Sequence, residues 1–212
     1  MEPFISIKGP AAPLMLDNVD TDVIIRIERL TSVAPEGLGA DALEALRLRP
    51  DGSEEPSCVL NHPPFRRPPI LLAGRNFGCG SSREGAVWAL RALGVRCVIA
   101  ESFGDIFHNN CFPNGMLPIA LPRSAVQQLA AHASTGAEIE VDLEALRITL
   151  PDGRQQAFAI DPMRREGLLT GVDEVTRTLR RQRAIDEWQM RDRHAQPWLW
   201  EPVSQPQPTL QP

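Results

Sequence analysis

The spacing of apolar positions changes along the chain between the two-residue period of a strand and the longer period of a helix. Strict alternation of apolar and polar residues predicts half-buried strands at residues 4–9 and 138–143. Short continuous apolar runs predict further strands at residues 69–73, 95–100 and 117–121. Helical spacing, in contrast, is found at residues 84–93, 124–133 and 171–193. The pattern therefore predicts an α/β fold.

The order of these segments predicts how the strands pair. The segment 84–93 is apolar on most faces, so we expect a helix that is buried or covered by a partner, and Gly94 ends it. A strand, a helix and a second strand in this order should make a parallel pair. Residues 146–150 and 156–160 flank a Pro-Asp-Gly turn, which predicts a β-hairpin. We expect a central, mostly parallel sheet with flanking helices and a hairpin.

The most informative stretch is a glycine-rich loop between the strand at 69–73 and the helix that begins near Glu84. It contains the following candidate site residues: Asn76, Gly78, Gly80, Ser81, Ser82 and Arg83. Glycines allow a close backbone approach, and a helix amino terminus favours an anion. Ser81 and Glu84 have the spacing of a capping box. The loop is thus either an anion site, with Arg83 as a bidentate donor, or a tight turn with a capping serine.

The loop is not a Walker-type phosphate loop, and it fits a dinucleotide-binding fingerprint poorly. No Gly-Lys-Ser/Thr follows the loop, so it is not a Walker loop. The third glycine of a dinucleotide fingerprint is also missing after Gly78 and Gly80.

Polar residues on either side of the loop offer further candidates. Asp20 and Asp22 can orient a neighbouring arginine or hydroxyl, or form an Asx turn, and a buried β run is expected after them. Within the polar segment 101–115, His108, Asn109 and Asn110 either line a cleft or belong to a short helix packed on aromatic rings and capped by Asn114-Gly115, and we favour the helix. Residues 26–57 contain a short helix at 40–48 within a Gly/Pro-rich segment, which is either a lid or a surface excursion.

Composition narrows the class of protein. The chain has 212 residues, 42% hydrophobic and 23% charged, and a net charge of −5 without a basic patch. These values are typical of a globular domain and argue against a nucleic-acid partner. No apolar run is long enough for a membrane span, and the first residues lack signal-peptide features, so we expect a cytoplasmic protein. The four cysteines are widely spaced, which predicts no metal or cofactor bound by this chain.

Three motifs resemble one known family. Asn-Phe-Gly-Cys-Gly-Ser-Ser-Arg-Glu at 76–84 resembles the signature of the aconitase swivel domain, and in particular of the 3-isopropylmalate dehydratase small-subunit family. Asn-Val-Asp-Thr-Asp at 18–22 and Ser-Phe-Gly-Asp-Ile-Phe at 102–107 are similar to further motifs of that family. The resemblance implies a swivelling β/β/α domain over 1–194, with 26–57 as the substrate-specificity loop. Residues 195–212, rich in proline and glutamine, are expected to be a flexible tail.

The resemblance also implies a mechanism. In that family an aconitase-like large subunit holds a [4Fe–4S] cluster, and the small subunit completes the active site. Carried over by position, Ser81 would be the general base and Arg83 would hold a carboxylate of a small hydroxy diacid. Ser82, Asn76, Gly78 and Gly80 would support substrate binding, and Asp20, Thr21 and Asp22 would support the loop. The reaction implied is the isomerisation of 2-isopropylmalate to 3-isopropylmalate in leucine biosynthesis, and the chain alone should be inactive.

Two departures from the family pattern bear on the substrate. Gly85 stands where the family usually has histidine, and Arg26 stands where it commonly has proline. They leave open a paralogue that acts on another hydroxy diacid, such as a methylmalate or dimethylmalate. A non-catalytic ligand-binding domain is a further alternative, although the intact Ser81-Ser82-Arg83 run argues against it.

Overall fold

A computed structural model describes residues 1–200 of the chain. Contacts divide the chain into two compact units, Met1–Asp173 and Glu174–Pro212. The first unit holds the sheet, the glycine-rich loop and the motifs at residues 18–22 and 102–107. The predicted end of the domain at residue 194 stays a prediction.

The first unit is built on a seven-stranded sheet with the order β4-β3-β2-β1-β5-β6-β7. The strands are β1 (Ser6–Pro13), β2 (Ile70–Leu72), β3 (Cys97–Ala100), β4 (Leu117–Ala120), β5 (Glu138–Asp142), β6 (Arg147–Thr149) and β7 (Gln155–Ala157). Strands β1 to β4 are parallel, with Ala11 opposite Ile70 and Ile70 opposite Cys97. Strand β5 joins β1 in antiparallel fashion, and β6 and β7 form the hairpin. The predicted parallel sheet and hairpin are both confirmed.

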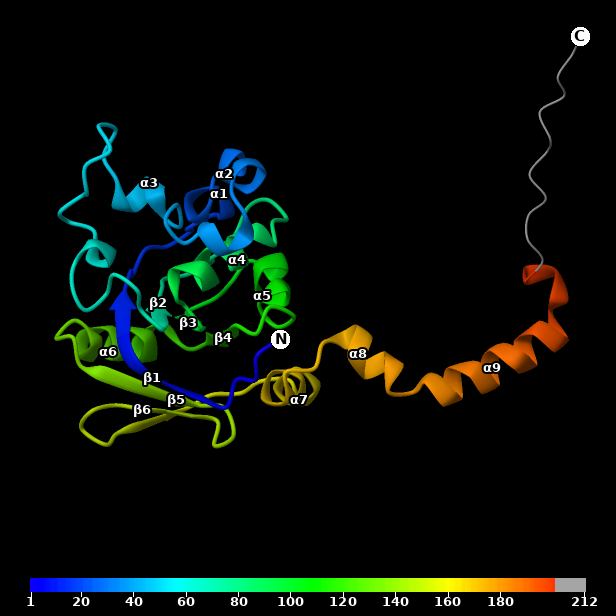
Figure 1. The fold of residues 1–212 in the computed structure, drawn as a ribbon. Helices are drawn as coiled ribbons and strands as arrows, with labels where there is room; N and C mark the ends of the chain where they lie inside the picture. The colour runs from blue at the N-terminus through cyan, green and yellow to red at the C-terminus, as the bar shows by residue number, and fades with distance from the viewer. Residues whose placement is uncertain (201–212) are drawn as a thin grey trace, which may run out of the picture. The chain divides into compact units, whose positions relative to one another are not determined.

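Helices lie on both faces of this sheet (Figure 1). The helices of the first unit are α1 (Thr21–Ile24), α2 (Ile27–Ser32), α3 (Glu44–Arg47), α4 (Gly85–Leu93), α5 (Asp105–Cys111), α6 (Arg123–Ala133) and α7 (Pro162–Thr170). Short 3-10 turns lie at Pro35–Gly37 and Val59–Asn61. The second unit contains α8 (Glu174–Leu179), α9 (Gln182–Ala195) and a 3-10 turn at Pro197–Leu199.

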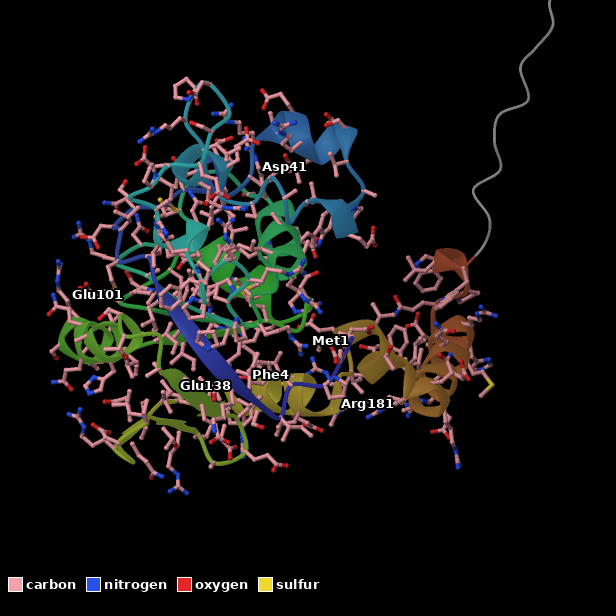
Figure 2. All side chains as sticks on the ribbon, turned by 60° about the vertical axis from the view of Figure 1, so that its left-hand side comes forward. Met1, Phe4, Asp41, Glu101, Glu138 and Arg181 are labelled. Carbon is pink, nitrogen blue, oxygen red and sulfur yellow. The ribbon has the colours of Figure 1, made fainter. Side chains whose placement is uncertain are left out.

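Alternate residues of the central strands enter two separate hydrophobic clusters. Leu71 and Val98 belong to the cluster under α4 and α5, whereas Ile70, Leu72 and Ile99 belong to the cluster under α6. Phe4, just before β1, is buried in the second cluster, while Glu138 at the start of β5 is exposed (Figure 2). A parallel sheet buried on both faces is the arrangement that its continuous apolar runs require.

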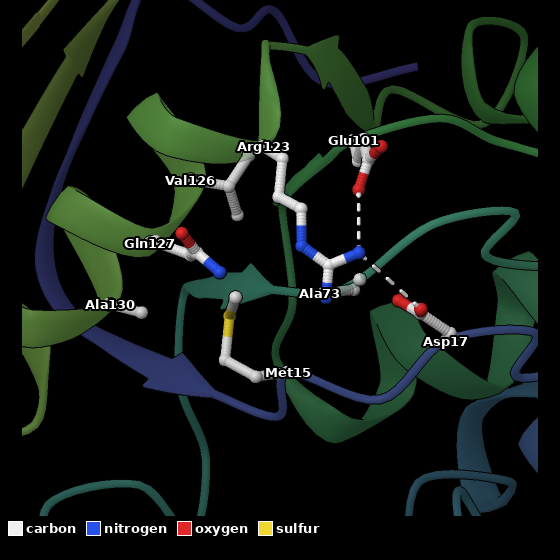
Figure 3. A pocket seen from close by; sticks show the side chains of 9 residues that line it. Met15, Asp17, Ala73, Glu101, Arg123, Val126, Gln127 and Ala130 are labelled. Atoms are coloured by element: carbon white, nitrogen blue, oxygen red, sulfur yellow. Dashed lines mark ion pairs between the residues drawn. The ribbon is translucent and has the colours of Figure 1, made fainter.

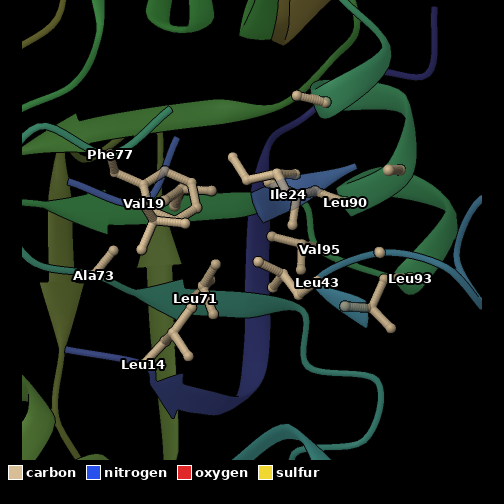
Figure 4. Packing of buried hydrophobic residues seen from close by; sticks show 14 of the residues in the cluster. Leu14, Val19, Ile24, Leu43, Leu71, Ala73, Phe77, Leu90, Leu93 and Val95 are labelled. Carbon is tan, nitrogen blue, oxygen red and sulfur yellow. The ribbon is translucent and has the colours of Figure 1, made fainter. Parts of the chain in front are cut away.

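The middle of the segment 26–57 is anchored to this core, whereas both of its ends are exposed. Leu38, Ala42 and Leu43 are fully or almost fully buried in the cluster under α4. Figure 4 shows Leu43 beside Ile24, Leu90 and Val95. The helix expected at 40–48 is shorter than predicted and spans only Glu44–Arg47, because Leu43 adopts a left-handed conformation with φ of 55° just before it.

Two further predictions of secondary structure are wrong. The buried β run expected after Asp22 is the helix α1, because the Asp20 side chain accepts a hydrogen bond from the Val23 N–H at 2.7 Å and caps a helical turn. The single helix expected at 171–193 is two helices, since Gly171 ends α7 with a positive φ and Arg181 departs from helical geometry between α8 and α9.

The structure describes the first residues of the predicted tail, 195–200, and the flexibility of the tail stays a prediction. Trp200 folds back on α9, where its Nε1 donates to Asp192 at 2.9 Å and Arg193 lies over its ring. The rest of the predicted tail, residues 201–212, lies outside the described residues.

Candidate active site

The glycine-rich loop joins β2 to α4 at the carboxyl ends of the parallel strands. Backbone hydrogen bonds tie it to two neighbouring segments: Gly78 donates to the carbonyl of Val19 at 2.7 Å, and Phe77 donates to the carbonyl of Ser102 at 3.0 Å. The segments that follow β1 and β3 therefore clamp the loop from both sides. All three family-like motifs meet at this place.

Asn76 and Gly78 shape the first half of the loop. Asn76 has a left-handed φ of 58°, and its side-chain amide donates to Asn18 Oδ1 at 2.9 Å. Gly78 has a φ of 71°, and a Cβ there would lie 2.2 Å from the Phe107 ring. Both residues have contacts within the chain that fix the path of the loop. Their predicted part in substrate binding stays a prediction.

Ser81 does not cap the following helix, so the predicted capping box is wrong. Helix α4 begins at Gly85, with Glu84 as its N-cap and no side-chain cap hydrogen bond. Instead, Glu84 Oε1 accepts a hydrogen bond from the Asn114 side chain at 2.8 Å. The hydroxyl of Ser81 is exposed and has no hydrogen-bond partner among residues 1–200, which leaves it available for chemistry.

Hydrogen bonds hold the carbonyl groups of the backbone around Ser81, whereas N–H groups in the same stretch have no partner among residues 1–200. The buried Thr21 donates its hydroxyl to the Ser81 carbonyl at 3.0 Å, and its N–H donates to the carbonyl of Cys79 at 2.9 Å. The N–H groups of residues 80–83, in contrast, have no acceptor in the described part of the chain. Free N–H groups at the amino end of α4 offer an anion hydrogen bonds and a favourable helix dipole.

Arg83 is held by the second aspartate of the upstream motif. Its guanidinium contacts Asp22 Oδ1, and only 18% of its side chain is exposed, against 57% for Asp22. This is the contact by which an aspartate can orient an arginine for a planar anion. The structure thus brings Asp20, Thr21 and Asp22 together with Gly80, Ser81 and Arg83, while Ser82 is exposed beside them.

Gly85 is explained by the packing of α2. A Cβ at Gly85 would lie 2.4 Å from Leu30 Cδ2 and 2.7 Å from Leu30 Cδ1. Helix α2 is further held to α3, where Arg29 pairs with Glu44 at 3.0 Å and Arg26 lies 3.6 Å from the same carboxylate. A larger residue at 85 would force the Leu30 side chain, or α2 with it, to shift.

His108 belongs to an aromatic cluster on α5, as the favoured interpretation predicts. Its ring lies 5.6 Å from Phe103 and 5.1 Å from Phe112. Arg164, from α7, donates to His108 Nδ1 at 3.2 Å and to Asn109 at 2.7 Å. Burial, and then the charge of Arg164, lower the pKa of His108, while Asp105 acts in the opposite direction. The histidine is a neutral packing residue here.

Residues 1–200 contain no group of three metal-ligating side chains that could hold an ion. Cys97 and Cys111 are fully buried, and burial raises the pKa of both thiols. Within the same residues, no helix is both long and apolar enough to cross a membrane.

The fold and the loop together define a class of protein. A model of the aconitase C-terminal domain matches residues 1–124, and a second model, LeuD_N, matches residues 127–162. A solved structure of 3-isopropylmalate dehydratase from Methanocaldococcus jannaschii has a TM-score of 0.64 to this chain at 27% identity. It covers 87% of this chain and 99% of its own. The class is therefore the aconitase swivel domain.

Curated relatives define the particular family. The 3-isopropylmalate dehydratase small subunit of Rhodospirillum centenum is 52% identical over 200 residues, which cover 93% of this chain and 98% of that protein. That of Paracoccus denitrificans is 46% identical over 201 residues, covering 94% and 100%. The chain belongs to the 3-isopropylmalate dehydratase small-subunit family.

Proposed function

We propose that this chain, with a large subunit, isomerises 2-isopropylmalate to 3-isopropylmalate in leucine biosynthesis in the cytoplasm. The names of the relatives support the hydro-lyase reaction and the need for a partner. The observation that carries the proposal is the exposed Ser81, which does not cap a helix. It lies between free backbone N–H groups and Arg83, which Asp22 orients.

In this proposal Ser81 is the general base. It removes the proton from the carbon next to the one that bears the hydroxyl, and the hydroxyl then leaves to give an unsaturated diacid. Water returns with the hydroxyl on the neighbouring carbon, and Ser81 returns the proton. A serine hydroxyl is a weak acid, so it can act as a base only where nearby donors stabilise its alkoxide. The free N–H groups of residues 80–83 and the positive end of α4 would provide this stabilisation.

Arg83 would hold one carboxylate of the substrate. A guanidinium binds a carboxylate through two parallel hydrogen bonds, which fixes its orientation as well as its position. Asp22 would keep the guanidinium in place before the substrate arrives. Ser82, Asn76, Gly78 and Gly80 would complete the substrate-binding loop.

The iron–sulfur cluster of this reaction would be held by the large subunit. The described cysteines do not fit as its ligands, because three of them are buried and they do not converge with other ligating side chains. When bound, such a cluster would activate the leaving hydroxyl. This chain would contribute the base, the carboxylate clamp and the loop that carries them.

The test is anaerobic co-expression with the aconitase-like large subunit, followed by turnover assays on 2-isopropylmalate and on methyl-substituted malates. Turnover of 2-isopropylmalate is expected. A well-formed complex that turns over none of these diacids would refute the proposal and favour a ligand-binding domain instead.

A second candidate is the same reaction on a smaller hydroxy diacid. The close packing of Leu30 on Gly85 favours it, because it sets α2 against α4 where the family usually has histidine. Turnover of a methylmalate or dimethylmalate with no turnover of 2-isopropylmalate would establish this alternative.

A further inference from the structure

The glycine-rich loop ends in a sequence motif that the structure leaves unformed. In a capping box the serine hydroxyl accepts a hydrogen bond from the N–H of a glutamate three residues on, and the glutamate carboxylate accepts one from the serine N–H. Ser81 and Glu84 have this spacing, yet neither hydrogen bond is made among residues 1–200. The Ser81 hydroxyl and both N–H groups have no partner in that part of the chain. The Glu84 carboxylate is held elsewhere.

Asn114, in the turn between α5 and β4, holds this carboxylate. Asn114 Nδ2 donates to Glu84 Oε1 at 2.8 Å and to the carbonyl of Asn110 at 2.8 Å. Asn114 Oδ1 accepts from Trp88 Nε1 at 3.1 Å. Because the indole N–H only donates and the carbonyl only accepts, the orientation of the Asn114 amide is determined, with its NH2 group toward Glu84. The backbone carbonyl of Asn114 accepts from Arg91, which joins the turn to α4.

A carboxylate at the start of the same loop shows the alternative. Asp17 Oδ1 accepts a hydrogen bond from the Arg75 N–H at 2.8 Å, so this N–H is not available to a ligand. Figure 3 shows the Arg123 guanidinium between Asp17 and Glu101, with its Nη1 3.9 Å and 3.7 Å from their oxygens. A carboxylate beside this loop thus binds a backbone N–H when it is directed there, and the Glu84 carboxylate is directed away.

The surroundings of Glu84 would allow the capping box to close. Glu84 already has helical backbone angles, with φ of −63° and ψ of −29°. Closure requires its side chain to turn back toward Ser81 and residues 82 and 83 to join the helix. Ser81, Ser82 and Glu84 are exposed, so packing does not oppose this change. It would also shift Arg83, whose guanidinium contacts Asp22.

We propose that Asn114 is a positioning residue for the reaction: by holding Glu84, it keeps the capping box open and Ser81 free. The inference rests on the proposed role of Ser81 as the base. If Glu84 were released, its carboxylate would occupy the Ser81 N–H, and its own N–H would bind the Ser81 hydroxyl. The hydroxyl would then face the helix instead of the substrate, and the nearby negative charge would disfavour the alkoxide.

The first test needs this chain alone and no turnover. Asn114→Asp keeps the size of the side chain and the acceptor for Trp88 Nε1, but it replaces the NH2 donor with a carboxylate oxygen that repels Glu84. In the NMR spectrum of the isotope-labelled chain, we expect the Ser81 amide proton to move downfield, because it gains a hydrogen bond. Asn114→Ala should give the same shift without added charge. Asn110→Asp, which adds the charge to a side chain without hydrogen bonds among residues 1–200, should leave the resonance in place. A Ser81 resonance that stays in place in Asn114→Asp and in Asn114→Ala would overturn the proposal.

The second test is a reciprocal rescue in the complex with the large subunit. Asn114→Asp should lower kcat about fivefold, which is the population shift that one serine cap of ordinary strength produces. Asn114→Asp/Glu84→Gln should regain most of that loss, because the amide introduced at position 84 donates to the carboxylate introduced at position 114. The contact is then restored with donor and acceptor exchanged. A merely structural loss at position 114 would persist in the double variant, and that result would contradict the assignment. Should the parent complex turn over no diacid, the proposed function fails, while the Ser81 resonance still decides whether Asn114 keeps the capping box open.

Discussion

Replacement of Gly85 by alanine is the sharpest test of how the 26–57 segment is attached. The new methyl group would lie 2.4 Å from Leu30 Cδ2 and 3.2 Å from Leu30 Cγ, so Leu30 or the whole of α2 must move. Overpacking of this kind typically costs about 1–3 kcal/mol. Alanine gains up to about 1 kcal/mol of helix propensity over glycine, and less at a first helical position. We expect a net loss of about 1–2 kcal/mol.

The assay is the free energy of unfolding in urea, followed by tryptophan fluorescence. A matched control is Gly167→Ala in α7, where the nearest atom to the new Cβ is the Val172 carbonyl oxygen at 3.5 Å. That variant should gain stability, by roughly 1 kcal/mol or less, because propensity acts there without a clash. The same substitution should therefore lower the free energy of unfolding at position 85 and raise it at position 167.

The double variant Gly85→Ala/Leu30→Ala isolates the contact. Since the shortened side chain at 30 makes room for the methyl group, the double variant should be more stable than the sum of the two single effects, by about 1 kcal/mol or more. Additive effects, or a Gly85→Ala protein as stable as the parent, would refute the packing argument.

Three further outcomes follow from the contacts of the site. Asp20→Ala should cost about 1 kcal/mol of unfolding free energy, since it removes the cap of α1, and urea unfolding checks this. Asp22→Asn should lower kcat/KM of the assembled enzyme by roughly tenfold, mainly through KM, because Arg83 loses its charged partner, and steady-state kinetics on 2-isopropylmalate measure the split. The pKa of His108 is lower in the folded state than in the unfolded state. Between about pH 6.5 and the folded pKa, the unfolded state therefore binds more protons than the folded state. The free energy of unfolding should decline as the pH falls through this range. His108→Gln should flatten this decline in Tm between pH 7.5 and 5.5, and an unchanged slope would show that other groups cause it.

The sheet and the loop could be predicted from the sequence, because a short stretch of residues is enough to indicate each of them. Apolar runs such as residues 69–73 and 95–100 predict strands by themselves, and a loop with three glycines before a helix predicts either an anion site or a tight turn. The start of α7 carries an equally local signal that the sequence interpretation missed. Asp161 accepts hydrogen bonds from Met163 and Arg164, and Pro162 occupies the first turn, which is a standard helix start.

Other features depend on contacts between distant residues and have no local signal. Ser81 and Glu84 have the spacing of a capping box, but Asn114 binds Glu84 and the helix begins at Gly85, three residues later than a Ser81 cap requires. The burial of Leu38 and Leu43 depends on α4, more than forty positions away, so the sequence left the Gly/Pro-rich segment open between a lid and a surface excursion. Gly85 is unexplained until Leu30 is placed against it.

The assignment of Ser81 as the base is tested by turnover of 2-isopropylmalate with Ser81→Ala in the assembled enzyme. We expect a loss of kcat of about 10²–10⁴-fold, with normal binding of the large subunit. Ser124→Ala, which removes an exposed hydroxyl at the start of α6, should retain full activity. Near-normal turnover by Ser81→Ala in an intact complex would contradict the assignment.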